Sequence, residues 1–262
     1  MPTFDRPDGT LVYDIAGEGP PLLLLCGLGG SRRYWDNLLP ALTARFTVVA
    51  MDHMGCGETV SRRTEHTVPA LADDVTALLD HLGIEAAHFI GHSTGAATGL
   101  VLGAVAPERI KRMVLFAGWP GRDPFFDLCF KVRRRQLVDS GVAAYHGATP
   151  LFLYPPRFVA EHSQTVQAVV DGLIAASPPT ETMLARIDML LAFDRRAELA
   201  DIETAPLILC ARDDQLTPLH CSEALAAGIP DARLAVMDWG GHAASQTAPE
   251  AFLSLVLDEL SH

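Results

Sequence analysis

Residues 91–95 read Gly-His-Ser-Thr-Gly, so a serine stands between two glycines. An apolar stretch, 86–90, precedes this motif and small residues, 96–102, follow it, which predicts a strand, a sharp turn and a helix. The two glycines leave room around a strained turn. Ser93 would project from that turn beside the first N–H groups of the helix, which favour a developing negative charge. This arrangement suits nucleophilic attack on a carbonyl, although the same pattern also occurs in ordinary turns.

A serine hydroxyl needs a base, and the base needs a carboxylate that fixes its tautomer. Asp213 and Asp214 follow an apolar run at 206–211, and His242 follows another at 233–237. Taken alone, the acid pair is typical of a helix cap and Gly-Gly-His of a surface turn. Together the groups occur in the order serine, acid, histidine, each after a predicted strand, as in one known class of triad. We expect Ser93 as nucleophile, His242 as base and Asp214 as its orienting acid.

Apolar runs predict the strands that must position these groups. The predicted strands are 10–16, 21–26, 46–51, 86–90, 112–117, 206–211 and 233–237, with helical patterns between most of them. Alternating strands and helices predict an α/β fold with a mostly parallel central sheet flanked by helices. From 120 to 202 only helical patterns occur, separated by Thr149-Pro150 and by 154–156. We therefore expect a core domain, 1–119 and 203–262, that carries a helical insertion, 120–202.

Composition narrows the function. The chain has 262 residues, 49% of them hydrophobic, and a formal net charge of -12, which argues against non-specific binding to nucleic acid or anionic membranes. No apolar run approaches the roughly 20 residues of a membrane span, and the first residues do not resemble a secretory signal, so we expect a cytoplasmic protein. The five cysteines form no C-x-x-C pair, which predicts buried thiols and no metal site. The glycine-rich loop 27–31 lacks a phosphate-binding motif, so we expect no cofactor.

At these residues the sequence resembles the α/β-hydrolase fold family, from end to end. Residues 214–218 resemble the segment that bears the family's acid, which favours Asp214 over Asp213. Residues 26–30 resemble its His-Gly oxyanion loop, with Cys26 in place of the histidine, and 52–57 resemble a structural turn. The resemblance implies that the N–H groups of Leu28 and Thr94 form an oxyanion hole. It also implies that 120–202 are a helical cap inserted after the sixth strand.

A narrower resemblance is to the RutD-type hydrolases of pyrimidine utilisation. It rests on the stretches 129–135, 150–155, 210–214 and 240–243, two of which lie in the expected cap. This resemblance implies hydrolysis of a carbamate or of aminoacrylate. A carboxylesterase or a lactonase on a hydrophobic substrate is the alternative within enzymes, because a fold does not determine a substrate. A small-molecule receptor with slow turnover is the alternative of another class.

The substrate side offers weaker signals. Gly27, Trp119, Phe126 and Phe130 are our candidates for contacts with a small-molecule substrate, Trp119 because it directly follows a strand at the catalytic edge. Many more aromatic residues lie in or beside the cap: Phe125, Tyr145, Phe152, Tyr154, Phe158 and Phe193. Simple packing explains most of them. The basic run 131–135 is either a carboxylate site or a solvated helix face, and we favour the latter. For His92 we favour packing over catalysis. A homodimer is left open.

Overall fold

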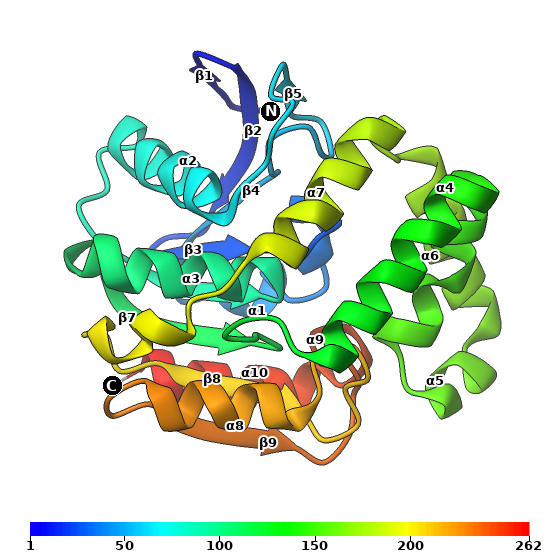
Figure 1. The fold of residues 1–262 in the computed structure, drawn as a ribbon. Coiled ribbons are helices and arrows are strands. Elements are labelled where there is room, and N and C mark those ends of the chain that lie inside the picture. Colours follow the sequence, from blue (N-terminus) through cyan, green and yellow to red (C-terminus); the bar gives the residue numbers. More distant parts are fainter. Residues whose placement is uncertain (262) are drawn as a thin grey trace.

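The computed structural model describes residues 1–261, in which one twisted sheet separates two layers of helices (Figure 1). In this part of the chain the sheet has nine strands, in the order β1-β2-β4-β3-β6-β7-β8-β9, with β5 paired to β2. β1 and β2 form antiparallel pairs, whereas the strands from β4 to β9 in this order pair in parallel. The strands are β1 (Thr3–Arg6), β2 (Gly9–Ala16), β3 (Pro21–Leu25), β4 (Thr47–Met51), β5 (Val60–Ser61), β6 (Ala87–His92), β7 (Ile110–Phe116), β8 (Leu207–Ala211) and β9 (Arg233–Met237).

The inner strands are continuous apolar runs because helices cover both of their faces. Every residue of β8 is buried, and all of β3 except Pro21 is buried. Each strand that the sequence predicts is confirmed to within two residues. The two strands that it did not predict, β1 and β5, are short and lie at the edge beside β2.

Two hydrophobic clusters fill the space between the sheet and its helices. On one face lie α2 (Val68–His81), α3 (Thr94–Val105) and α8 (Leu219–Gly228), and on the other lie α1 (Leu39–Thr43) and α10 (Pro249–Leu260) (Figure 1). The short helices are η1 (Arg32–Trp35), η2 (Pro107–Arg109), η3 (Arg196–Asp201) and α9 (Ala244–Thr247). α3 is apolar all round because the sheet, α2 and η3 all pack against it.

Helices alone fill the chain between β7 and η3, as the sequence predicts. They are α4 (Pro124–Leu153), α5 (Pro156–Glu161), α6 (Ser163–Ala175) and α7 (Thr180–Ala192). In Figure 1, α4, α5 and α6 stand to one side of the sheet, and α7 runs between them and the core. The chain enters and leaves this region at one neck, where Gly121 bridges Asp194 and the Arg195 N–H donates to the Pro120 carbonyl at 2.8 Å. We refer to residues 120–202 as the cap.

Two expectations about the cap need correction. It follows the seventh strand along the chain, not the sixth, when the short strands β1 and β5 are counted. The expected break at Thr149-Pro150 is also wrong: helix α4 continues to Leu153, and its non-helical residue is Gly141, at φ 81°. Glycine tolerates this left-handed backbone, which lets the two halves of α4 fold against each other.

Two further predictions concern thiols and membranes. All five cysteines are free and buried, as expected. No helix in residues 1–261 combines the length and apolar character that a membrane crossing requires.

The cap contains a buried histidine that makes stability depend on pH. His146 Nε2 donates to Ser177 Oγ at 2.8 Å, whereas its Nδ1 is buried without a partner in residues 1–261. Burial, aided by the charge of Arg133, lowers the pKa of His146 to about 4. The unfolded chain therefore binds the proton more tightly than the folded protein does. The free energy of unfolding is accordingly unaffected by protonation of His146 above pH 6.5 and decreases as the pH falls from 6.5 to 4. The loss reaches up to about 3 kcal/mol.

Urea unfolding at pH 7.5 and pH 4.5 tests this prediction. We expect the free energy of unfolding to fall less with acid in His146→Gln than in wild type. His162→Gln, which replaces an exposed cap histidine, should keep the wild-type slope. Equal slopes in wild type and His146→Gln would contradict the prediction.

Candidate active site

Ser93 lies on a strained turn between β6 and α3, at φ 53° and ψ -110°. The turn is held by two backbone bonds, from the Ser93 N–H to the Phe116 carbonyl at 2.8 Å and from the Ala97 N–H to the Ser93 carbonyl at 2.9 Å. A Cβ at Gly95 would lie 2.1 Å from the Leu25 carbonyl oxygen, and one at Gly91 would lie 2.3 Å from that of Gly95. These distances explain the glycine on each side of the motif, because no larger residue fits there.

His242 and Asp214 come together at the carboxyl edge of the sheet, on the loops after β9 and β8. His242 Nδ1 and Asp214 Oδ2 are 2.8 Å apart, and both side chains are almost fully buried. Asp214 Oδ1 also accepts the backbone N–H groups of Leu216 and Thr217, at 2.7 and 3.0 Å, and Thr217 Oγ1 donates to the Ala117 carbonyl. These bonds fix the carboxylate, so the His242 Nδ1–H faces it and Nε2 is left as the proton acceptor.

Asp213 has a different place, which supports the choice of Asp214. Its Oδ1 accepts the Gly241 N–H at 2.9 Å and so holds the loop that carries His242.

His92 also holds the loop that carries His242. Its ring stacks on Tyr34 at 4.5 Å between centroids and on Phe116 at 4.9 Å, and Nε2 donates to the His242 carbonyl at 2.9 Å. Burial holds the pKa of His92 well below its usual range, so the ring is neutral. The Tyr34 hydroxyl bonds to Ser245 Oγ at 2.7 Å. These contacts agree with the packing role expected for His92 and bring its ring to 4.9 Å from that of His242.

The Ser93 hydroxyl and His242 Nε2 form no hydrogen bond with protein groups in residues 1–261. Ser93 is 5% exposed and His242 1% exposed, so both lie in a site largely closed to water. Catalytic hydrogen bonds are often long in free enzymes and shorten when substrate binds. The geometry brings together the His242–Asp214 pair and leaves the Ser93 hydroxyl available.

The glycine-rich loop after β3 lies against the serine turn. A Cβ at Gly27 would lie 3.2 Å from Ser93 Cβ. Thr94 begins α3, and in residues 1–261 neither its N–H nor that of Leu28 donates to a protein acceptor. Two free amides thus belong to segments that touch at the serine, which is the arrangement an oxyanion hole requires.

Sequence reasoning missed the residue that holds this loop, Arg186 of α7. Its Nη2 donates to the Leu28 carbonyl at 2.9 Å and to His53 Nδ1 at 2.7 Å. His53 Nε2 in turn lies 3.7 Å from Cys26 Sγ. Nothing in the spacing of the sequence links residue 186 to residues 26–28, because the link is a contact between cap and core.

The turn at 52–57 is structural, as the family resemblance implied. The Asp52 carboxylate accepts the backbone N–H groups of Arg32 and Glu58 at 2.7 and 2.8 Å, and it pairs with the buried Arg32 guanidinium at 2.5 Å. This ion pair ties the end of β4 to the chain that follows the glycine-rich loop.

The aromatic candidates form a closed cluster between cap and core. The Trp119 ring lies 4.9 Å from that of Phe126 and 5.5 Å from that of Phe193, and Phe126 lies 4.6 Å from Phe130. Trp119, Phe126 and Phe130 are at most 2% exposed. The structure therefore shows them packed together where α4 meets the sheet, and contact with a substrate stays a prediction for all three.

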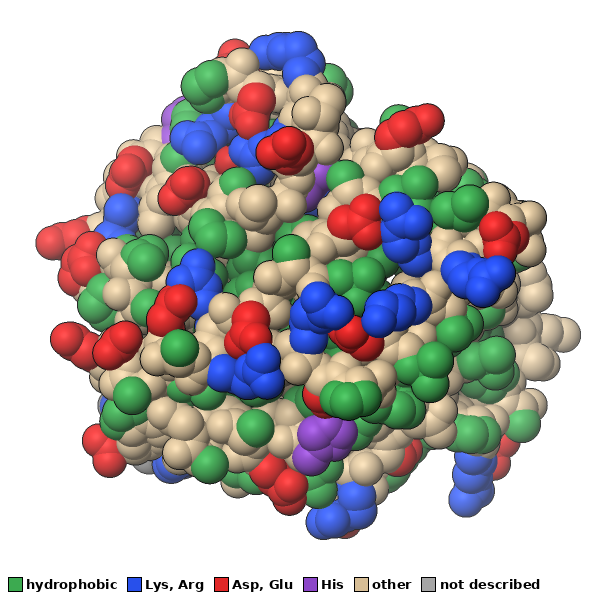
Figure 2. All heavy atoms as spheres, in the orientation of Figure 1, with side chains coloured by type: hydrophobic (Ala, Val, Ile, Leu, Met, Phe, Trp, Pro, Cys, Tyr) green, Lys and Arg blue, Asp and Glu red, His purple; other side chains and the backbone are tan. Residues whose placement is uncertain are grey.

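The basic run 131–135 divides into two kinds of residue. Lys131 and Arg135 are exposed and Arg134 is half-buried. They pair with Asp127, Asp139 and Asp188 respectively, as residues of a solvated face would. Figure 2 shows basic and acidic side chains interspersed on the face that carries α4 and α7.

Arg133 is the exception, and for it the solvated-face interpretation is wrong. It is 5% exposed, and its guanidinium lies 4.4 Å from the centre of the Tyr145 ring and 4.7 Å from that of Phe152. Its one hydrogen bond in residues 1–261 goes to Thr149 Oγ1, at 3.3 Å, whereas Nε and Nη1 have no partner. The two halves of α4 thus enclose a cation without a carboxylate, since the chain folds back at Gly141.

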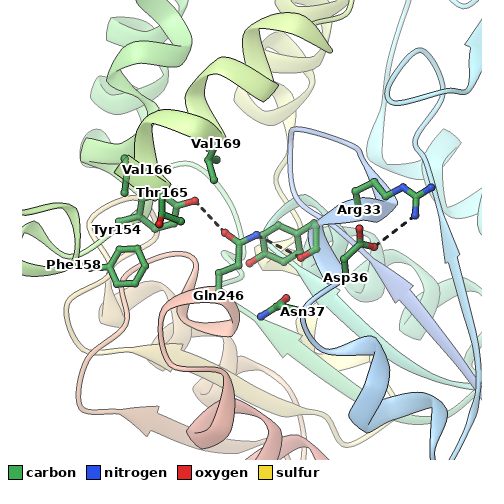
Figure 3. A pocket seen from close by; sticks show the side chains of 10 residues that line it. Arg33, Asp36, Asn37, Tyr154, Phe158, Thr165, Val166, Val169 and Gln246 are labelled. Carbon is green, nitrogen blue, oxygen red and sulfur yellow. Dashed lines mark hydrogen bonds and ion pairs between the residues drawn. The ribbon is translucent and has the colours of Figure 1, made fainter. Parts of the chain in front are cut away.

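A hollow of about 280 Å³ opens at the seam between cap and core, beside the loop of His242 (Figure 3). Its cap side is formed by Tyr154, Phe158, Thr165, Val166 and Val169, and its core side by Arg33, Tyr34, Asp36, Asn37 and Gln246. Tyr154 bonds to Gln246 at 3.1 Å across the seam. Tyr34, which lines this hollow, stacks on His92, the residue before Ser93.

One cluster has the residue types of a metal site. Asp123, His220 and Cys221 place their ligand atoms within 4.8 Å of one another. Asp123 Oδ2 accepts from His220 Nε2 at 2.8 Å, and Oδ1 caps α4. Burial raises the pKa of Cys221 to about 12, which keeps the thiol protonated. Hydrogen bonds thus explain the cluster as a tie between the start of the cap and α8.

Comparison with known proteins identifies the family of this chain. Residues 20–249 match the α/β-hydrolase fold family. The chain is 42% identical over 257 residues to a protein of Azorhizobium caulinodans named "Putative carbamate hydrolase RutD", covering 98% of this chain and 97% of that protein. A protein of the same name from Serratia proteamaculans is 38% identical over 252 residues, with 94% of each chain covered.

Solved structures show the same fold. A hydrolase from Pseudomonas aeruginosa superposes with a TM-score of 0.85 at 28% identity, covering all of this chain and 98% of that one. The enol-lactonase from Burkholderia xenovorans superposes with a TM-score of 0.91 at 24% identity over the full length of both. The chain therefore belongs to the α/β-hydrolase fold family and, within it, to the RutD group.

Proposed function

We propose that this hydrolase cleaves a small ester, amide or carbamate through a covalent intermediate on Ser93. The observation that carries this proposal is the buried His242–Asp214 pair, at 2.8 Å, on loops that meet beside the serine turn. A buried carboxylate that also accepts two backbone N–H groups remains a fixed acceptor and directs one imidazole nitrogen. A purely structural role explains neither the free Ser93 hydroxyl nor the pair.

The proposed reaction has two halves. Ser93 Oγ attacks the substrate carbonyl while His242 Nε2 takes its proton, and the N–H groups of Leu28 and Thr94 stabilise the oxyanion. His242 then gives the proton to the leaving group, and an acyl or carbamoyl group stays on Ser93. Water, activated by His242, releases that group. No cofactor or metal takes part in these steps.

The relatives support a carbamate as substrate, since the similarity to the proteins named carbamate hydrolase extends through the cap. The same groups would also cleave a hydrophobic ester or open a lactone, because the chemistry at the carbonyl is the same. Turnover of matched short-chain esters, lactones and carbamates separates these substrates. A receptor with slow turnover is a further alternative, which tight binding with negligible product release would favour.

Arg133 favours a substrate that also carries a carboxylate. Burying an unpaired guanidinium has a large desolvation cost, and a carboxylate that forms bidentate hydrogen bonds with it offsets that cost. Arg133 lies on Phe152, whose neighbour Leu153 accepts the Ala243 N–H at 3.1 Å, directly beside His242. We therefore propose that the far end of the substrate is anionic and is directed toward Arg133.

The remaining proposals concern the surroundings of the enzyme. One chain supplies every group in the proposed site, so a homodimer is compatible with the reaction but not required. The reaction needs no nucleic acid or membrane. A cytoplasmic location is supported by the five buried free thiols, which suit a reducing compartment.

Ser93→Ala tests the nucleophile. We expect wild type to show a burst of product from a short chromogenic ester and to be labelled by a serine-directed phosphonate, because both require attack by Ser93 Oγ. The variant should lose burst and label while keeping its melting temperature. Ser254→Ala, an exposed serine on α10, is the control and should behave as wild type. Equal labelling of Ser93→Ala would disprove the assignment.

Asp214→Asn tests the orienting acid. The amide presents an N–H to His242 Nδ1 and so favours the tautomer that cannot accept the serine proton. We expect kcat to fall on the order of 10³- to 10⁴-fold, with KM little changed. Asp213→Asn retains an acceptor for the Gly241 N–H and should lose far less. Similar kcat values for the two variants would show that Asp214 is not the acid.

Arg133→Met tests the anionic end of the substrate. The assay compares 4-nitrophenyl hemisuccinate with 4-nitrophenyl butyrate, which differ mainly in a terminal carboxylate. We expect wild type to favour the hemisuccinate at least about tenfold in kcat/KM, since a charge-assisted pair contributes roughly 1.5–3 kcal/mol. Arg133→Met should lose that preference yet hydrolyse butyrate normally, while Arg135→Met should match wild type. No preference in wild type, or one kept by Arg133→Met, would refute the proposal.

A further inference from the structure

We propose that Arg186 of the cap is the residue that positions the oxyanion loop, so that docking of the cap completes the oxyanion hole. The inference rests on the proposed function, because it concerns the amide of Leu28. It adds a positioning residue that lies outside the serine, acid and histidine segments and about 160 residues along the chain from the loop it holds.

The contact is direct and specific. Arg186 Nη2 lies 2.9 Å from the Leu28 carbonyl oxygen, and Nε lies 3.3 Å from the same atom. Arg186 is 3% exposed, and in residues 1–261 no Asp or Glu pairs with it. Its charge is therefore directed at a peptide carbonyl and a neutral histidine, although a carboxylate would offset the desolvation cost of the guanidinium better. A cation retained in such a place points to a role in fixing that peptide.

The loop needs an external anchor because of its composition. Gly27, Gly29 and Gly30 surround Leu28, and glycine loses more conformational freedom on ordering than any other residue. A Cβ at Gly29 would meet nothing within 4 Å. The peptide that carries the Leu28 N–H is held by one bond within the loop, in which its Gly27 carbonyl accepts the Gly30 N–H at 3.0 Å. From outside the loop, Arg186 holds the next peptide at the Leu28 carbonyl, and the His53 N–H donates to the Gly30 carbonyl at 2.8 Å.

The same arginine sets the state of His53. A guanidinium can only donate, so His53 Nδ1 accepts from Arg186 Nη2, and the proton of the neutral ring is on Nε2. That N–H points to Cys26 Sγ, at 3.7 Å. A chain of contacts therefore runs from Arg186 of the cap, through His53 of the turn at 52–57, to Cys26 at the end of β3. Cys26 stands where the family resemblance leads one to expect a histidine, and Arg186 with His53 supplies the anchoring that a cysteine cannot.

The experiment compares Arg186→Met and Arg186→Lys with wild type. It measures kcat and KM for a neutral chromogenic ester, the inhibition constant of a trifluoromethyl ketone, and the melting temperature. The ketone forms a hemiketal oxyanion with the serine and so reports on the oxyanion hole. Asp188→Asn is the matched control, since it removes the Arg134–Asp188 ion pair from the same helix without touching the loop.

We expect Arg186→Met to lower kcat by roughly 10- to 100-fold, because displacing a donor costs less than the 10²- to 10³-fold loss of removing one. KM should stay within about threefold, and the inhibition constant of the ketone should rise by the same factor as kcat falls. Arg186→Lys, which keeps the positive charge on a single donor nitrogen, should recover part of both. Asp188→Asn should stay close to wild type in every measurement.

Three results would overturn the proposal: wild-type kcat in Arg186→Met, a loss confined to KM, or an equal loss of kcat in Asp188→Asn. If Arg186→Met does not fold, Arg186→Lys decides by the same criteria. If the proposed function itself is wrong, the Ser93→Ala experiment shows it, because wild type would then lack a burst or Ser93→Ala would retain turnover. Wild-type behaviour of Arg186→Met beside an inactive Ser93→Ala would refute the role of Arg186 alone.

Discussion

Close packing of the serine turn against the end of β3 is the constraint on which the rest of the structure depends. With only 2.1 Å between a Cβ at Gly95 and the Leu25 carbonyl, any bulk at that position would push α3 away from the sheet. The contact holds Ser93 at φ 53° and brings the loop after β3 beside it. The free amides of Leu28 and Thr94 therefore belong to segments that touch. The strained backbone of Ser93 is kept in place by the packed core on both sides of the sheet.

Around that turn, the candidate catalytic groups are held in place by neighbouring side chains and backbone N–H groups. The backbone N–H groups of Leu216 and Thr217 hold Asp214, Asp213 holds the loop of His242, and His92 donates to the His242 carbonyl. Each support links segments from different strands, so His242 is fixed by the sheet as a whole and not by its own short loop. Such supports determine whether a base remains within reach of its nucleophile.

Two buried cations of the cap lack a carboxylate partner in the described residues. The chain has a formal net charge of -12, yet Arg133 and Arg186 are buried in or beneath the cap with no carboxylate partner in residues 1–261. Arg186 uses its charge on the Leu28 carbonyl, and Arg133 lies between two aromatic rings. A buried cation without a carboxylate partner favours an anionic group beside it, because such a group offsets the cost of burying the charge. The cap thus contributes electrostatics as well as a cover.

The sequence by itself determined the sheet, the order of serine, acid and histidine, and the crowded turn at Ser93, because these depend on local apolar runs and on spacing within a few residues. It also separated the helical cap from the core. Only the tertiary structure decided that α4 turns at Gly141 instead of Pro150, that Arg133 is buried while its neighbours are exposed or half-buried, and that Arg186 reaches Leu28. Those features arise from contacts between residues far apart in the chain, and the physical reason they escape a sequence pattern is that burial and partner are properties of the packed fold, not of the residue type.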